Sequence, residues 1–190
     1  MSDESDEELI RRHVGGDRAA FGVLVERHQQ RVYNLAFRML GRPEDAADAT
    51  QDTFVTCMAK LAGFRGASSF TTWLHRVTVN TCYDSLRKRA REVPVEEQEE
   101  SAGTAVADPA DASATAVDVQ RALLSVPEEF RAVLVLHDVQ GVPYEAIAEA
   151  LGTPIGTIKS RLHRGRVALG RALRGEQREG SPASNRRGQP

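Results

Sequence analysis

The spacing of its hydrophobic residues constrains the fold of this chain more than any other feature. Phe21, Leu24, Val25 and His28 fall at positions i, i+3, i+4 and i+7, and similar steps continue to Leu40. That period belongs to an amphipathic helix. No segment combines strict apolar–polar alternation with turn signals, which is the pattern of a strand. The sequence therefore predicts an all-α protein.

An acidic stretch, residues 92–116, divides the helical pattern into two parts. It is rich in Glu, Asp, Ala, Ser and Pro and contains no aromatic residue. Such a segment buries too little apolar surface to offset its ordering entropy, so we predict a flexible acidic linker. A disordered tail at residues 175–190 and a disordered start up to about Asp6 are expected for the same reason. Two small helical domains remain, residues 7–91 and 117–174.

In the first domain, Gly41 is expected to end a long helix, and Pro43 lies in the first turn of the next. That next helix covers residues 44–61. Its side chains expected to face inward are Ala47, Phe54, Val55 and Met58.

A loop is expected over residues 63–69, and another helix follows it to about residue 91. Thr71 or Thr72 can cap that helix. Four residues at steps of four, three and four share one of its faces, so that a polar stripe lies beside an apolar one. They are Trp73, Val77, Asn80 and Asp84.

Residues 143–166 of the second domain have the layout of a helix-turn-helix unit. A short helix from Pro143 leads to Gly152, where the turn needs a residue that tolerates positive φ. A longer basic helix follows, with Thr153 as its N-cap, and suits the phosphates and major groove of DNA. The residues expected to face DNA are Thr157, Lys159, Ser160, Arg161, His163 and Arg164. Arg161 is predicted to read a base; a plain helical hairpin with a solvated basic face is the alternative.

Charge is strongly segregated along the 190 residues, although the formal net charge is only −2. Residues 61–91 and 131–190 each carry a net charge of +5, whereas residues 92–130 carry −9 and residues 1–60 carry −3. Segregation of this size favours two polyanion-binding modules joined by a spacer that does not itself bind. Two solvated helix faces around a soluble linker are the alternative.

Several function classes lack their sequence signatures. No apolar run approaches the roughly 20 residues that span a bilayer, and the acidic start is not a secretory signal, so a cytoplasmic protein is expected. Cys57 and Cys82 form neither a CxxC pair nor a zinc set, and no metal or cofactor is expected. Cys57 is expected to be an inert buried thiol, and Cys82 could sense redox state only if exposed. The motifs of helical nucleases and deaminases are missing, so an enzyme is not expected.

Four sequence stretches follow one another in a specific order. They are DRAAFGVLVERHQQRVYNLAFRML, PEDAADATQDTFVTCMAKL with its Asp-Ala-x-Asp-x-x-Gln-Asp-x-Phe pattern, FRGASSFTTWLHRVTVNTCYDSLRKRAR, and the helix-turn-helix. Together they resemble regions 2 and 4 of sigma-70 RNA polymerase sigma factors of the extracytoplasmic-function (ECF) group, in particular the actinobacterial sigma-M type. The resemblance covers nearly all of residues 7–174. It implies a subunit, without chemistry of its own, that directs core RNA polymerase to specific promoters and promotes strand opening.

The resemblance assigns roles to individual residues. Region 2, residues 7–91, would bind core polymerase and melt the −10 element, and region 4, residues 117–174, would recognise the −35 element. The residues implied to bind the clamp helices of the β′ subunit are Asp45, Asp48, Gln51, Asp52 and Phe54. Those implied to hold the −10 strand, by base capture or phosphate contact, are Phe64, Arg65, Ser69, Phe70, Arg76, Asn80, Arg87 and Lys88. Trp73 is expected to pack in the core, and for Phe70 packing and base stacking both stay open.

The implied partners are the β′ and β subunits of core RNA polymerase, promoter DNA and an anti-sigma factor, which in this family is usually membrane-anchored; no small-molecule substrate is implied. Because no further domain follows residue 174, control is expected to come from another protein. A stand-alone helix-turn-helix regulator of duplex DNA is the competing hypothesis. It leaves residues 45–54 without a role and requires a dimer interface or a ligand pocket that the sequence does not show.

Overall fold

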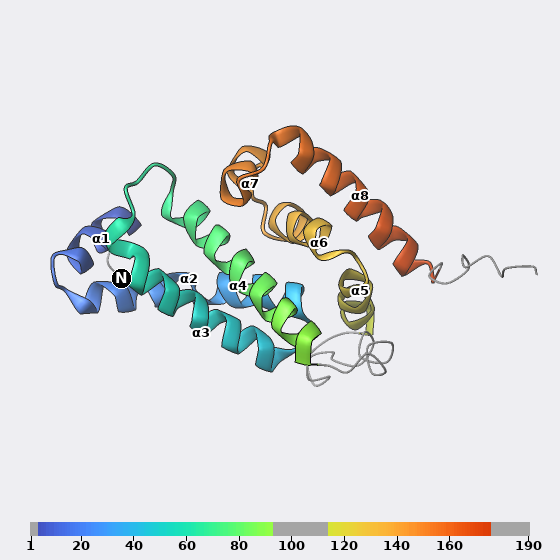
Figure 1. Ribbon diagram of the computed structural model, residues 1–190, viewed down its shortest axis with the longest axis horizontal. Coiled ribbons are helices and arrows are strands. Elements are labelled where there is room, and N and C mark those ends of the chain that lie inside the picture. The colour runs from blue at the N-terminus through green and yellow to red at the C-terminus, as the bar shows by residue number, and fades with distance from the viewer. Residues whose placement is uncertain (1–3, 93–113, 176–190) are drawn as a thin grey trace, which may run out of the picture.

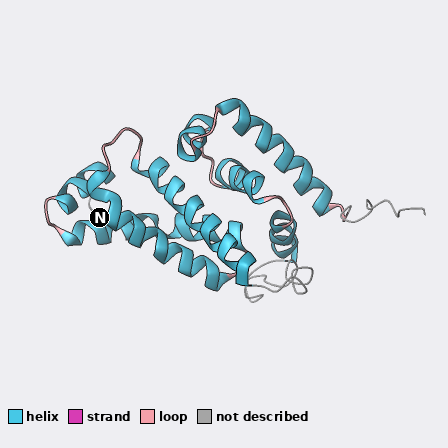
Figure 2. Ribbon diagram, viewed as in Figure 1, coloured by secondary structure: helices cyan, strands magenta, loops and turns pink. Residues whose placement is uncertain are grey.

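The computed structural model describes residues 4–92 and 114–175, and within those ranges all regular secondary structure is helical (Figure 2). The all-α fold expected from the hydrophobic spacing is therefore confirmed. The predicted linker and the predicted tail fall almost wholly outside the described residues.

The N-terminal part consists of α1 (Asp6–Val14), α2 (Arg18–Leu40), α3 (Pro43–Lys60), the 3-10 turn η1 (Leu61–Gly63) and α4 (Phe70–Glu92). Gly41 ends α2 as expected, with the positive φ of 84° that glycine tolerates best. The cap of α4 differs from the prediction. The Ser69 hydroxyl, rather than that of Thr71 or Thr72, accepts a hydrogen bond from the Thr72 N–H at 3.1 Å, because the helix begins earlier than the sequence indicated.

The inward face of α3 also differs from the prediction. Val55 and Met58 are 53% and 51% exposed, and Ala47 is exposed as well. Of the four residues expected to face inward, only Phe54 is buried. The buried side chains of α3 are Ala46, Ala49, Thr53, Phe54 and Cys57. Apolar residues occupy more than one side of this helix, and packing against α2 and α4 selects the side that is buried.

The C-terminal part consists of α5 (Ala114–Leu124), α6 (Glu128–Leu134), the π-helical turn η3 (Val135–Val139), α7 (Tyr144–Leu151) and α8 (Ile155–Leu173). Six consecutive residues, 131–136, are buried, so the end of α6 and the start of η3 lie in the core. Gly165 of α8 allows close approach to α6, because a Cβ there would lie 2.9 Å from Leu134 Cδ1. Thr153 does not cap α8; Pro154 is the N-cap residue, and the Thr153 hydroxyl donates to the Leu151 carbonyl at 3.1 Å.

The two helical parts pack against one another (Figure 1). One hydrophobic cluster contains Leu35 and Met39 of α2, Val79 of α4 and much of α6 to α8. Arg131 of α6 is 7% exposed, and its guanidinium donates to the Met39 carbonyl of α2 and to the Leu124 carbonyl at 2.6 Å. Burial lowers the pKa of Arg131 to about 10, so this group stays charged at neutral pH. No local sequence pattern predicts this contact between the parts.

Candidate functional surfaces

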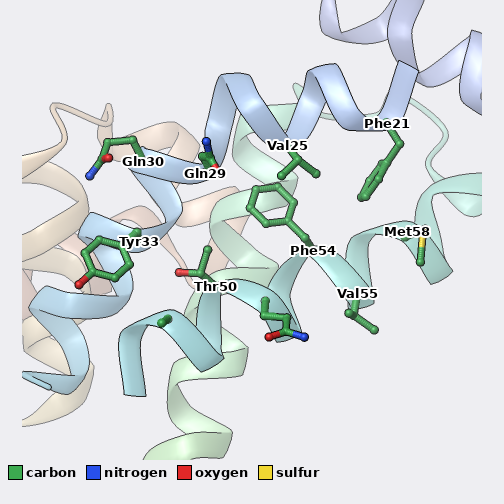
Figure 3. A pocket seen from close by; sticks show the side chains of 11 residues that line it. Phe21, Val25, Gln29, Gln30, Tyr33, Thr50, Phe54, Val55 and Met58 are labelled. Atoms are coloured by element: carbon green, nitrogen blue, oxygen red, sulfur yellow. The ribbon is translucent and has the colours of Figure 1, made fainter. Parts of the chain in front are cut away.

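A groove of about 630 Å³ lies between α2 and α3. Figure 3 shows Phe21, Val25 and Tyr33 on one wall, with Phe54 between the two helices. Val55 and Met58 line the α3 side, and both are about half exposed. A monomeric protein rarely leaves a large apolar depression uncovered unless something binds there.

The carboxylates predicted to bind the polymerase lie on the same helix as the groove. Asp48 and Asp52 are exposed, and Gln51 and Phe54 line the groove directly. Asp45 is half-buried and lies 3.7 Å from the Arg89 guanidinium of α4. Gln51 and Phe54 thus lie at the groove, Asp48 and Asp52 are exposed on the same helix outside the groove lining, and Asp45 is within reach of α4.

The loop before α4 rests on a cluster of aromatic side chains. The Phe64 ring lies 5.5 Å from Trp73 and 6.2 Å from Phe70, measured between centroids. Phe70 is 1% exposed and therefore packs in the core instead of offering its ring to DNA, which corrects the DNA contact predicted for it. Trp73 packs against the same core, as expected. Arg65 is exposed on the loop, and Ser69 is the helix cap.

The polar residues of α4 face away from that core. Arg76, Asn80, Arg87 and Lys88 are all exposed, and Arg87 pairs with Asp84 one turn away. Arg76 makes a contact that the sequence did not predict: its Nε donates to the Ala150 carbonyl of α7 at 2.8 Å, and its Nη2 donates to the Glu149 carbonyl. The α4 surface thus meets the helix-turn-helix.

The helix-turn-helix has the predicted turn. Gly152 has a φ of 59°, and α8 leaves it as the longer basic helix. Lys159, Ser160, His163 and Arg164 are exposed on its N-terminal half, and Thr157 is half-buried. The Lys159 ammonium lies 5.7 Å from the ring centroid of Tyr144, which holds it over α7.

Arg161 is placed differently from the prediction. Its side chain is 28% exposed and lies 3.4 Å from the Glu129 carboxylate of α6. It also lines a cavity of about 310 Å³ together with Arg76, Asn80 and Tyr83 of α4. Arg161 points towards the interior of the molecule because Ile158 and Leu162 fix the orientation of α8 on the core. Arg161 therefore lies at the edge of the packed face of α8 and is paired with α6, and its role as a base reader stays a prediction.

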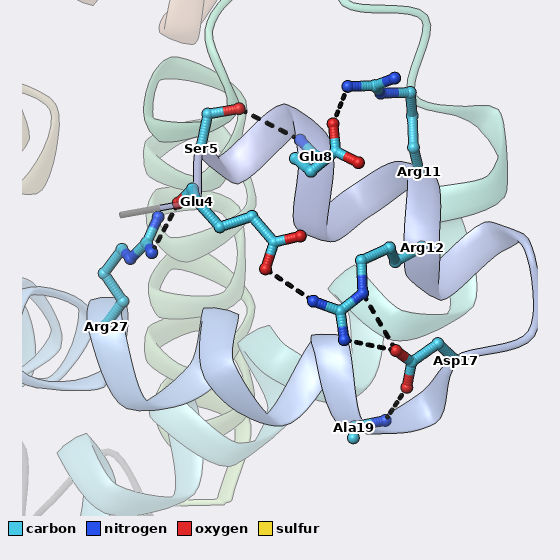
Figure 4. A network of polar contacts seen from close by, with 8 residues as sticks. All are labelled: Glu4, Ser5, Glu8, Arg11, Arg12, Asp17, Ala19 and Arg27. Atoms are coloured by element: carbon cyan, nitrogen blue, oxygen red, sulfur yellow. Dashed lines mark hydrogen bonds and ion pairs between the residues drawn. The ribbon is translucent and has the colours of Figure 1, made fainter. Parts of the chain in front are cut away.

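A polar network around α1 was not predicted from the sequence (Figure 4). Arg12 bonds to Glu4 at 2.6 Å and to Asp17 at 2.6 Å, and Arg27 donates to Asp6 at 2.5 Å. The buried ring of His28 lies within hydrogen-bonding distance of Asp6, 2.8 Å. The sequence signal that could have predicted the start of α1 is Ser5 followed by three acidic residues. Serine is a common N-cap, and acidic residues are favoured in the first turn of a helix.

Both cysteines are completely buried, and burial raises the pKa of each thiol to about 12. The burial expected for Cys57 is confirmed, and the exposure that a redox role of Cys82 would need is absent in this structure. Among the described residues, no group of three or more His, Cys, Asp or Glu could hold a metal ion. Within residues 4–92 and 114–175, no helix combines the length and apolar character needed to span a bilayer.

Comparison with known proteins gives a family for both parts of the chain. The family model for Sigma-70 region 2 matches residues 24–92, and that for Sigma-70, region 4 matches residues 116–169. The ECF RNA polymerase sigma factor SigM of Mycobacterium tuberculosis strain H37Rv is 41% identical over 171 residues, covering 90% of this chain and 86% of that protein. The chain therefore belongs to the ECF group of sigma-70 RNA polymerase sigma factors, and a stand-alone helix-turn-helix regulator is not favoured.

Solved structures agree with this assignment. The sigma factor RpoE of Bartonella quintana, solved with the anti-sigma factor NepR, is similar with a TM-score of 0.66 and 28% identity, over 83% of this chain and 98% of that chain. CnrH, solved with the cytosolic domain of CnrY, is similar with a TM-score of 0.66 and 27% identity, over 90% of this chain and 99% of that chain.

Proposed function

We propose that the groove between α2 and α3 is where this sigma factor binds core RNA polymerase. The observation that carries the proposal is the exposure of Val55 and Met58 beside the exposed carboxylates Asp48 and Asp52. An apolar groove on a helix that also carries exposed carboxylates fits a partner that offers apolar side chains within a basic surface. The β′ clamp helices of the family are that partner, and the β subunit would contact region 4.

The second part of the proposal concerns the −10 element. Arg65 of the loop and Arg76, Asn80, Arg87 and Lys88 of α4 offer cations and an amide to a melted strand. The aromatic cluster of Phe64, Phe70 and Trp73 supports the loop from below, so Phe70 shapes the capture site without touching the base. The family boundaries, residues 7–91 for region 2 and 117–174 for region 4, belong to this proposal.

For the −35 element, the exposed face of α8 is the surface that fits the major groove. Lys159, Ser160, His163 and Arg164 share that face near the N-terminus of the helix, the part that enters the groove in helix-turn-helix proteins. An arginine there can bond to the O6 and N7 atoms of guanine. Arg164 is therefore a better candidate for base reading than Arg161.

Regulation by an anti-sigma factor is proposed by analogy with the relatives. RpoE was solved with the anti-sigma factor NepR and CnrH with the cytosolic domain of CnrY, and this chain aligns with both over most of its length. A protein that works on RNA polymerase acts in the cytoplasm, and we propose that location. The described residues contribute binding surfaces, and we propose that the protein has no catalytic activity of its own.

The groove assignment can be tested with a matched pair of variants. Val55→Glu places a carboxylate in the groove, whereas Val139→Glu makes the same change at a residue of similar exposure, 55%, on η3. Burying an unpaired charge at an interface core costs well over 1 kcal/mol, so Val55→Glu should weaken core polymerase binding about tenfold or more. Val139→Glu should bind normally. Equal affinities of both variants in a fluorescence titration with core polymerase would place the binding surface elsewhere.

A further inference from the structure

We propose that Asp6 of α1 is a positioning residue for the −10 strand, which acts through His28 of α2 on the aromatic side chains beneath the capture loop. The capture loop comprises residues 64–69, between η1 and α4. The inference rests on the proposed function, because it needs that loop to receive a base of the melted strand. Neither Asp6 nor His28 lines the groove between α2 and α3, and neither is among the residues proposed to contact DNA.

The first described residues are fixed to α2 by polar contacts, although their composition predicted disorder. Arg27 of α2 donates to the Glu4 carbonyl at 2.8 Å (Figure 4) and to one oxygen of the Asp6 carboxylate at 2.5 Å. The other oxygen of that carboxylate lies 2.8 Å from His28 Nε2. The Asp6 side chain is 16% exposed, so both contacts are largely shielded from water and are strengthened by it. Asp6 therefore joins α1 to two residues of α2.

The contact with Asp6 determines where His28 carries its proton and how its ring is oriented. A carboxylate only accepts hydrogen bonds, so Nε2 carries the hydrogen atom and donates it to Asp6. The imidazole is buried, so water does not readily take the place of the carboxylate when Asp6 is replaced. Rotation of the ring would break this hydrogen bond. Asp6 thus fixes the plane of the imidazole.

The oriented imidazole packs edge-on against Phe70, the first residue of α4. The two ring centroids are 5.3 Å apart, and the planes meet at 68°. Aromatic pairs of this kind prefer defined orientations, so a change in the plane of His28 changes the packing of Phe70. Phe70 is fully enclosed, and a close-packed interior transmits such a change to the next side chain.

Phe70 in turn lies beneath the capture loop. Its ring centroid is 6.2 Å from that of Phe64, at the start of the loop, and 5.9 Å from that of Trp73. Phe64 and Trp73 are half-buried, so they retain surface on which a base can stack. Contacting rings, from His28 through Phe70 to Phe64 and Trp73, therefore connect the Asp6 carboxylate with the loop proposed to hold a base.

The attachment of α1 itself does not depend on Asp6 alone. Leu9 and Ile10 of α1 are buried in the same hydrophobic cluster as Phe70, so loss of the Asp6 carboxylate should leave α1 in place. The expected defect is a loss of precision at the loop. Bases are then held less well, whereas the phosphate contacts proposed for Arg76 and Lys88 are unchanged.

The test separates base-dependent from phosphate-dependent binding of one strand. Holoenzyme is assembled from core polymerase and the full-length chain. A fluorescent single strand of the −10 element, from a promoter at which the holoenzyme initiates, carries one abasic site at each position in turn. An abasic site removes a base and keeps the phosphates, so the affinity ratio of intact to abasic strand measures base capture. For the wild type we expect a ratio of about tenfold or more at the captured position.

Asp6→Ala should lower that ratio about threefold or more, the effect of losing a defined aromatic orientation, with unchanged affinity for the abasic strand. Asp6→Asn can still form a hydrogen bond with His28 Nε2 and should keep most of the wild-type ratio. The matched control is Asp17→Ala. Asp17 caps α2 and pairs with Arg12 of α1 at 2.6 Å, so its removal weakens the junction of α1 and α2 without touching His28. The ratio of this control should equal that of the wild type.

His28→Leu gives a second route to the same result if Asp6→Ala folds poorly, because it leaves no buried imidazole without a partner. It should lower the ratio as Asp6→Ala does, and adding Asp6→Ala to it should lower the ratio no further. A wild-type ratio for Asp6→Ala or His28→Leu, an additive fall in the double variant, or an equal fall for Asp17→Ala would overturn the inference. If no abasic site weakens binding of the wild-type protein, the proposed −10 function fails, and the inference fails with it.

Discussion

His75 is a buried titratable side chain that none of the proposed binding surfaces uses. It is 4% exposed on α4, and neither ring nitrogen has a hydrogen-bond partner within the described residues. Burial and the positive charge of Arg31 lower the pKa of His75 from 6.5 to about 4, and His28 adds to this effect. The imidazole of His75 is therefore neutral in the folded protein at neutral pH.

This gives a pH dependence with a definite sign. Between pH 4 and 6.5 the unfolded chain binds more protons at His75 than the folded chain, so stability is complete above pH 6.5 and falls as the pH drops towards 4. A shift of this size corresponds to roughly 3 kcal/mol in total. Urea unfolding at pH 7 and pH 5 should show a smaller loss of stability for His75→Leu than for the wild type.

His163 provides the matched control, because it is exposed on α8. His163→Leu should lose as much stability on acidification as the wild-type protein. If His75→Leu also keeps the full wild-type pH dependence, another group is responsible for it.

At the scale of single helices, α8 separates its arginines by face. Ile158 and Leu162 are buried, so Lys159, His163 and Arg164 point outward and Arg161 points towards Glu129 of α6. Glu129 and Arg161 both belong to region 4, so this pair does not depend on how region 4 packs against region 2. The face that reads DNA is therefore fixed by packing within region 4.

Removal of Arg164 should change base preference, whereas removal of Arg161 should not. Arg164→Ala is expected to relax preference at one −35 position by about 1–3 kcal/mol, the value of a bidentate arginine–guanine contact. Arg161→Ala is the control, because Arg161 lies on the same helix but is paired with Glu129 of α6. Holoenzyme binding to a library of −35 variants measures both effects. A changed preference profile for Arg161→Ala with none for Arg164→Ala would restore the original assignment.

The sequence predicted the helices themselves better than it predicted which of their side chains pack against other helices. The long helices, the glycines at 41 and 152 and the helix-turn-helix follow from local spacing and turn chemistry, which neighbouring residues determine. The orientations of Val55 and Arg161 depend instead on partner helices distant in the sequence. For Arg76 the charge alone predicted an anionic partner, and a helix C-terminus satisfied that requirement as well as a phosphate would. No local pattern distinguishes the two.

At the scale of the whole molecule, two regions that must act far apart on DNA are packed around one hydrophobic cluster. The contacts of Arg131 and Gln120 with α2 stabilise this packing. The surfaces for polymerase and for DNA differ in how far this packing covers them. The groove between α2 and α3 is open in this structure, whereas the polar face of α4 is partly covered by α7. We therefore expect core polymerase to bind first and promoter DNA to follow.

The central claim is that this chain gives core RNA polymerase its promoter specificity. The most direct measurement is transcription in vitro on genomic DNA of the source organism, with 5′ ends mapped for core polymerase alone and for core polymerase with the purified chain. We predict that the chain adds discrete start sites, each preceded by common −10 and −35 sequences. Unchanged start sites, together with sequence-specific binding of duplex DNA by the chain alone, would contradict the claim and identify an ordinary helix-turn-helix regulator.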